Sequence, residues 1–198
     1  WPYDEAWTPG SDAGFIADFD EQGNRFNPNK VLFDPYSREI THNVYTDALG
    51  RLGVDDGVLG TGGELVDGVP RRRIDTAPYA PKGIVVAESA APDGKPQLPP
   101  EQAIIYEAGV TQLTGHPSAA RLADLLAGEP GFEGVSDIPA QYQGTYKGAG
   151  LLAPYLKAAG VTTIELLPVH ETNASETGRD GATNAWGYMT LSFFAPNR

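Results

Sequence analysis

The sequence contains no cysteine, which excludes disulfide bridges, zinc–thiolate sites and a thiol nucleophile. Basic residues are also scarce, since 14 Lys and Arg stand against 26 Asp and Glu and leave a formal net charge of −12. This balance argues against nucleic acid or an anionic membrane as a partner, and it suits a neutral substrate or a cation. No apolar run approaches the roughly 20 residues of a membrane span. An initiator Met and a signal peptide are missing as well, and because the chain opens on Trp1, Pro2 and Tyr3 we expect it to come from a longer chain.

Glycine and proline, in contrast, are abundant, with 24 and 17 residues in 198, and they predict many turns and long connections. We expect loops and short extended segments in residues 1–48 and a mobile surface loop in the glycine-rich residues 49–68. The proline-rich residues 91–100 are the best candidate for a domain boundary. The basic run at residues 71–73 is expected to lie on a solvated face or to pair with nearby acids rather than to bind phosphate.

The clearest periodic signal is at residues 151–169. Apolar residues at helical spacing in residues 151–159 predict a helix that ends at Gly160, and the β-branched run that follows predicts a buried parallel strand over residues 160–169. A second buried strand is predicted at residues 103–107, a short strand at 84–86, and a helix at 118–128 with Ser118 as its N-cap. Helix, glycine, strand and polar loop in this order predict an α/β fold.

The polar segment after the strand carries the best candidate for chemistry. Glu171, Thr172 and Asn173 offer hard oxygen ligands of the kind that calcium prefers, although calcium takes about six to eight oxygens and others would have to come from elsewhere. A solvated polar loop explains the same residues equally well. The sequence contains no phosphate-binding loop and no nucleophile-elbow motif, and its three histidines are too scattered to form a metal motif.

Four motifs in order resemble the isoamylase and glycogen-debranching branch of the α-amylase glycoside hydrolase family. They are Asn-Ala-Trp-Gly-Tyr-Met-Thr at residues 184–190 with Phe-Phe-Ala-Pro at 193–196, the strand at 160–168, Gly-Thr-Tyr at 144–146, and Asn-Pro-Asn-Lys to Asp-Pro-Tyr at 27–36. The chain departs from the family at strand one, where residues 106–114 lack the usual His and Arg, and at Ala185, where the family has Tyr.

The resemblance implies a (β/α)₈ catalytic barrel, of which this chain would hold the first two β/α units. The barrel would follow the end of a β-sandwich domain of the carbohydrate-binding type, in residues 1–48, and a glycine- and proline-rich connection, in residues 49–101. Residues 102–198 would begin the barrel, because a complete barrel needs about 250 residues. The two carboxylates of a retaining glycosidase, about 5 Å apart, would then lie on later strands, so that no catalytic residue is expected in this chain.

The resemblance also implies a function and a set of site residues. The expected reaction is hydrolysis of α-1,6 branch linkages in glycogen or amylopectin with retention, completed by the remainder of the barrel. Tyr188 matches a tyrosine that stacks under the sugar next to the scissile bond, and Trp186 is its neighbour in the cleft. Glu171 and Thr172 match calcium ligands of exported bacterial isoamylases. By looser alignment the further ligands would be Asn173, Asp75 and Asn197.

Two matters stay open at this stage. The alternative function is a glucan-binding or structural module that keeps the aromatic residues without catalysis. The compartment is also open, extracellular or periplasmic for the exported type and cytoplasmic otherwise.

Overall fold

The computed structural model describes residues 4–14, 26–42, 65–87, 94, 96–173 and 184–197. Helices and strands are mixed, which confirms the α/β class in its broad sense. The chain forms two compact units, the first made of Trp1–Ala87 with His170–Arg198 and the second of Glu88–Val169. In the part of the chain that the structure describes, no helix is long and apolar enough to cross a membrane. The division into residues 1–48, 49–101 and 102–198 stays a prediction.

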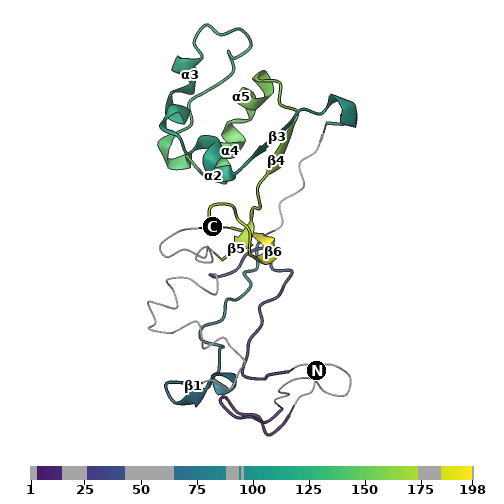
Figure 1. The fold of residues 1–198 in the computed structure, drawn as a ribbon, viewed down its shortest axis with the longest axis vertical. Coiled ribbons are helices and arrows are strands. Elements are labelled where there is room, and N and C mark those ends of the chain that lie inside the picture. The colour runs from purple at the N-terminus through teal and green to yellow at the C-terminus, as the bar shows by residue number, and fades with distance from the viewer. Residues whose placement is uncertain are drawn as a thin grey trace. The chain divides into compact units, whose positions relative to one another are not determined.

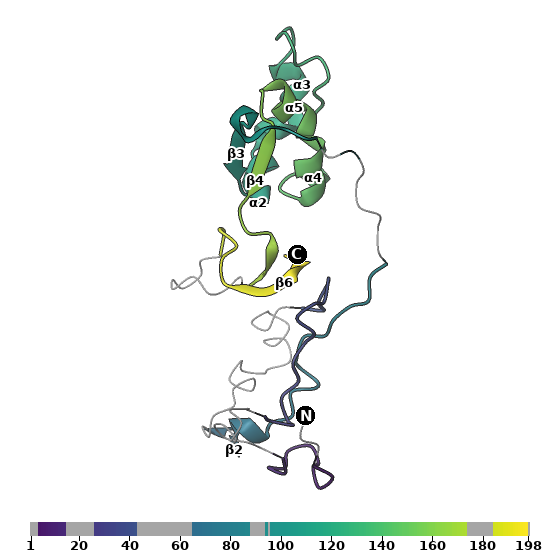
Figure 2. The ribbon, with the colours of Figure 1, turned by 90° about the vertical axis from the view of Figure 1, so that its right-hand side faces the viewer.

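The second unit is organised around two parallel strands, β3 (Ile105–Ala108) and β4 (Thr163–Leu166). They pair in register from Ile105 opposite Thr163 to Ala108 opposite Leu166, which confirms both predicted strands and their parallel direction. Figures 1 and 2 show the helices of residues 110–158 on one side of the pair and the short helix that precedes β3 on the other. The prediction that residues 160–169 and residues 103–107 form buried strands is wrong on burial, since all four residues of β4 and three of the four residues of β3 are exposed. A two-stranded sheet leaves each strand with one free edge and little cover.

The helical segment before β4 is divided into α4 (Tyr146–Leu151) and α5 (Ala153–Ala158). Pro154 explains the division, because it lies in the first turn of α5, where its missing N–H leaves no helical hydrogen bond unmade. The end of α5 follows the prediction. Gly160 has a φ of 86°, its N–H donates to Lys157 O, and the N–H of Val161 donates to Leu156 O, which together form a Schellman motif.

Helix α2 (Val110–Thr114) packs on α4 at close range, where Thr114 of α2 lies against Gly148 of α4. Thr114 is fully buried, and its Oγ1 accepts the N–H of Gly144 at 2.9 Å. A Cβ on Gly148 would lie 2.0 Å from Tyr142 O and 2.8 Å from Thr114 Oγ1, so only glycine fits there. Thr145 caps α4, because its side chain accepts the N–H of Gly148. The Gly-Thr-Tyr motif is thereby fixed against the helix that follows β3.

The remaining helices of this unit are short: η3 (Pro100–Gln102), η4 (Pro117–Arg121), α3 (Leu122–Leu125) and η5 (Ala140–Tyr142). The helix predicted over residues 118–128 is therefore two elements, η4 and α3, and the side chain that caps it is His116 rather than Ser118. A proline directly after His116 favours this start, since proline is well placed in a first turn. Gly128 lies beyond the last turn with a φ of 85°.

Among its described residues the first unit has short strands and longer stretches, such as residues 27–39 and 74–82, that belong to no helix or strand. Strands β1 (Leu65–Val66) and β2 (Val69–Pro70) form an antiparallel hairpin. Asp67 and Gly68 have φ of 49° and 81°, as a two-residue type I′ turn requires. Residues 65–68 are thus a hairpin and not the predicted loop, while residues 49–64 of that loop lie outside the described residues. The strand predicted at 84–86 is wrong, since a single bridge joins Ile40 to Gly83.

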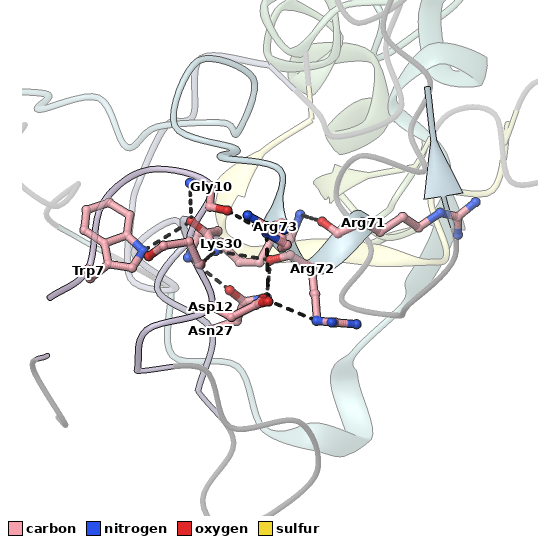
Figure 3. Close-up of polar contacts among 10 residues, drawn as sticks. Trp7, Gly10, Asp12, Asn27, Lys30, Arg71, Arg72 and Arg73 are labelled. Atoms are coloured by element: carbon pink, nitrogen blue, oxygen red, sulfur yellow. Dashed lines mark hydrogen bonds and ion pairs between the residues drawn. The ribbon is translucent and has the colours of Figure 1, made fainter. Parts of the chain in front are cut away.

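A cluster of polar side chains ties the irregular segments of the first unit together (Figure 3). Asn29 is at its centre and is fully buried. Its Oδ1 accepts from Trp7 Nε1 at 3.2 Å and from the N–H of Gly10 at 3.0 Å, and its Nδ2 donates to Ser11 O at 2.8 Å and to Arg72 O at 3.3 Å. A buried amide with all its groups bonded holds chain segments that have few apolar contacts.

The basic run forms η2 (Arg71–Arg73), directly beside this cluster. Arg72 Nε lies 3.3 Å and Arg73 Nε 3.9 Å from the Asp12 carboxylate, which confirms the predicted pairing with nearby acids. Lys30 donates from Nζ to Arg71 O at 2.7 Å and to Ile74 O at 3.0 Å. Burial lowers the pKa of Lys30 to about 8, and attraction to Asp75 opposes that shift.

Candidate functional site

The candidate site is built on an antiparallel ribbon of β5 (His170–Thr172) and β6 (Thr190–Pro196) in the first unit (Figure 1). Its register is irregular on both sides of Glu171, because His170 lies opposite Pro196, Glu171 opposite Ser192 and Thr172 opposite Thr190. More residues of β6 than of β5 occupy the same length of ribbon. Irregularities of this kind redirect side chains and are frequent next to functional sites.

The two predicted sugar-binding residues lie directly before β6, in a segment that we call the aromatic loop (residues 184–189). The side chains of Trp186 and Tyr188 are 64% and 58% exposed. Gly187 and Met189 have φ of 75° and 66°, and the second value is uncommon for a residue with a side chain. Two left-handed residues in a short stretch turn the backbone sharply, and the rings on either side of Gly187 are presented to solvent.

The backbone of the aromatic loop is held by hydrogen bonds from the side chains of Thr172, on β5, and of Asn184, the first residue of the loop itself. Thr172 is 1% exposed, and its Oγ1 donates to Tyr188 O and lies 3.1 Å from Met189 O. Asn184 Nδ2 donates to Thr172 Oγ1 at 3.0 Å, to Asn173 O at 3.2 Å and to Tyr188 O. The N–H of Asn173 donates to Met189 O at 3.2 Å. Thr172 and Asn173, predicted as cation ligands, therefore contact the same loop that carries the predicted sugar-binding rings.

A second feature of the ribbon is a pair of buried oxygen-bearing side chains. Glu171 is buried, and burial raises the pKa of its carboxyl group. Ser192 is directly opposite on β6 and is 2% exposed, and its Oγ has no hydrogen-bond partner among the described residues. Directly opposed residues of an antiparallel pair project to the same face. A buried carboxylate beside a hydroxyl without a partner is a polar environment that a bound cation would satisfy.

The other two predicted cation ligands are placed differently. Asn197 directly follows Pro196, the residue of β6 that lies opposite His170. Asp75 follows η2, where its Oδ1 accepts the N–H of Ala77 at 2.9 Å and its charge acts on Lys30. Within the described ranges, no group of three or more His, Asp or Glu side chains could hold a metal ion. The donors that the ribbon offers are therefore one carboxylate with hydroxyl, amide and carbonyl oxygens.

Three exposed aromatic rings lie near the ribbon as well. Phe193 packs against His170 with ring centroids 5.6 Å apart and the rings tilted by 59°, and Phe194 packs against Tyr36 at 5.3 Å with a tilt of 39°. Ser192 and Asn184 are the site residues that the sequence did not single out. Asn184 opens a recognised motif, which could have drawn attention to it. Nothing in the sequence marks Ser192, because its burial depends on the irregular register of β6.

The chain was compared with family models and with known proteins. No family model matches the chain. An isoamylase of Pseudomonas amyloderamosa is 39% identical over the whole chain, and an isoamylase of Flavobacterium sp. is 40% identical over the whole chain. A glycogen debranching enzyme of Yersinia enterocolitica is 37% identical over 88% of the chain. The chain spans only 22–23% of the length of these relatives.

These matches show to which class of enzymes the chain is related. The chain is homologous to enzymes of the isoamylase and glycogen-debranching branch of the α-amylase family, as the four motifs indicate. Within that branch it is similar to bacterial isoamylases over its whole length, and the matched stretch includes the β5–β6 ribbon and the aromatic loop.

Proposed function

We propose that this chain is part of a glycoside hydrolase that cleaves α-1,6 branch linkages in glycogen or amylopectin with retention of configuration. The observation that carries the proposal is the aromatic loop, where Trp186 and Tyr188 are exposed in a segment homologous to isoamylases. Flat aromatic rings bind the apolar faces of sugar rings while hydroxyl groups stay hydrated. A formal net charge of −12 suits a neutral polymer such as an α-glucan.

The proposed role of the second unit is to begin the catalytic barrel. Strands β3 and β4 are parallel neighbours, β3 is followed by helix α2, and β4 is exposed along its whole length. Apolar side chains such as Ile105 and Ile164 face solvent at this sheet, so further strands and helices would bury them. In this proposal the remainder of the barrel supplies that cover and also the two catalytic carboxylates, which lie outside residues 1–198.

Calcium is the proposed ion of the ribbon. The buried Glu171 carboxylate fits a cation, and Thr172, Asn173 and Asn197 add oxygen donors of the type that calcium takes. Bound calcium would supply a fixed positive charge that compensates the burial of Glu171. Asp75 stays a predicted ligand, and it also interacts with Lys30.

The experiment that tests the proposed function combines binding with turnover. The chain is run through native gels cast with glycogen, and release of reducing ends from glycogen and amylopectin is measured for the same sample. We expect retardation by glycogen without turnover for the 21.0 kDa chain alone. Turnover is expected once the remaining barrel is supplied, either as a second polypeptide or in one longer chain.

Two outcomes would contradict this proposal. Debranching by a sample that contains only the 21.0 kDa species would refute the placement of the catalytic carboxylates outside this chain. Binding of glycogen without turnover by the completed barrel would favour the alternative, a glucan-binding module that has lost catalysis.

A further inference from the structure

The aromatic loop is held at its backbone rather than at its rings. The carbonyl of Tyr188 accepts hydrogen bonds from both Thr172 Oγ1 and Asn184 Nδ2. The next carbonyl, that of Met189, lies 3.1 Å from Thr172 Oγ1 and accepts from the N–H of Asn173 at 3.2 Å. Thr172 belongs to β5, which comes before the loop in the chain, so these contacts fix the loop to a strand of the ribbon.

These contacts fall where the backbone is strained. Met189 holds a φ of 66°, and such a conformation persists only where surrounding contacts enforce it. Its N-terminal neighbour, Tyr188, has an exposed ring and a carbonyl oxygen that accepts two hydrogen bonds. The hydrogen bonds therefore set the direction in which the backbone leaves the loop, and with it the direction of the rings at Trp186 and Tyr188.

We propose that Thr172 and Asn184 are positioning residues, a clamp that orders the aromatic loop so that Trp186 and Tyr188 meet an α-glucan in a fixed geometry. This inference rests on the proposed function, to which it adds Asn184 and a second role for Thr172. The clamp touches no sugar itself. Its effect on binding comes from preorganisation, because a loop that is already ordered loses less entropy when ligand binds.

The side-chain chemistry explains why these residue types are needed. A threonine hydroxyl accepts from the Asn184 amide and donates to a carbonyl at the same time. Valine has the same shape as threonine and can do neither. Aspartate has the shape of asparagine, but its oxygens would face Thr172 Oγ1 and two carbonyl oxygens, where the amide nitrogen now donates.

The test uses the full chain labelled with 5-fluorotryptophan. The chain has three tryptophans, Trp1, Trp7 and Trp186, and Phe substitution at each assigns its fluorine signal. Trp7 donates to buried Asn29 in the polar cluster, so its signal reports whether the first unit is folded. Glycogen affinity is measured on the same samples by gel retardation.

The expected results separate the clamp from general structure. Thr172→Val and Asn184→Asp should shift or broaden the Trp186 signal, leave the Trp7 signal in place, and weaken glycogen binding about tenfold, the equivalent of one buried hydrogen bond of about 1.4 kcal/mol. Thr172→Ser keeps the hydroxyl and should restore both readouts. Thr190→Val removes a hydroxyl group from the residue opposite Thr172, and it should change neither the Trp186 signal nor the affinity for glycogen.

An unchanged Trp186 signal in Thr172→Val and in Asn184→Asp would overturn the clamp. If Thr172→Val also loses the Trp7 signal, it has failed to fold, and Asn184→Asp, at a less buried position, decides in its place. The fluorine readout needs no ligand. A parent chain that binds no glycogen would therefore refute the proposed function, while the spectra would still confirm or refute the clamp.

Discussion

Two glycines of helix α4 should respond in opposite directions to the same substitution. In Gly148→Ala the new methyl group would lie 2.0 Å from the carbonyl oxygen of Tyr142 and 2.8 Å from Thr114 Oγ1. In Gly150→Ala the methyl group would meet nothing within 4 Å. Both positions are inside the helix, where alanine is favoured over glycine by about 0.5–1 kcal/mol.

The cost at position 148 exceeds this gain. The carbonyl of Tyr142 cannot move freely, because it accepts from Thr145 Oγ1 at 2.8 Å and from the N–H of Thr145 at 3.2 Å. Overpacking typically costs about 1–3 kcal/mol, and each lost hydrogen bond costs about 1 kcal/mol more. We therefore expect Gly148→Ala to lower the free energy of unfolding by about 2–4 kcal/mol. Gly150→Ala should raise it by about 0.5–1 kcal/mol.

Urea unfolding followed by far-ultraviolet circular dichroism is the suitable assay, because α2 to α5 all lie in the second unit. The parent chain, each single variant and the double variant are compared at one pH. Equal effects of the two substitutions, or a neutral Gly148→Ala, would refute the tight packing of α2 against α4. Loss of stability in Gly150→Ala would refute the open surroundings of that position.

Two further predictions concern pH. Burial raises the pKa of Glu171 above 4.5, so the contribution of Glu171 to stability is complete below that value and is lost as pH rises through the raised pKa. In thermal melts without calcium, Glu171→Gln should therefore remove this decline in stability. Added calcium should stabilise the parent chain but not the variant. A decline that persists in Glu171→Gln would assign it to other groups. Lys30 has its pKa lowered from 10.5 to about 8, so the unfolded chain binds its proton more tightly and stability should rise between pH 8 and 10.5. Lys30→Met should flatten that rise, and an unaltered pH profile would show that the ammonium group is not desolvated.

The parts of the fold that were predictable are those fixed by local signals. Residues 151–169 contain a complete set, with helical spacing, a C-terminal glycine and a β-branched strand, and α5, Gly160 and β4 lie there. Burial was not predictable in the same way. An apolar sequence predicts that a strand will be buried. Among the described residues, however, β4 pairs only with β3, and this two-stranded sheet does not cover it.

The sequence named Trp186, Tyr188 and Glu171 as candidates, but it indicated neither the part played by Ser192 and Asn184 nor the arrangement of the candidate site. Trp186 and Tyr188 are exposed in one loop, and the buried Glu171 lies in strand β5 of the ribbon. The contact of Thr172 with the loop carbonyls depends on the irregular pairing of β5 with β6, which has no signature in sequence. Asn29 stood out in the sequence only as part of the motif at residues 27–36. No signal in the sequence indicated that it is fully buried at the centre of the polar cluster.

The central claim is that the aromatic loop binds α-glucan, and glycogen affinity of single alanine variants tests it most directly. Trp186→Ala and Tyr188→Ala should each weaken binding about tenfold or more, as truncation of an aromatic anchor does. Phe193→Ala is the matched control, because Phe193 is an aromatic residue of β6 that is 69% exposed and lies outside the loop. Unchanged affinity in both loop variants, or equal losses in all three, would contradict the assignment of the loop as the glucan-binding site.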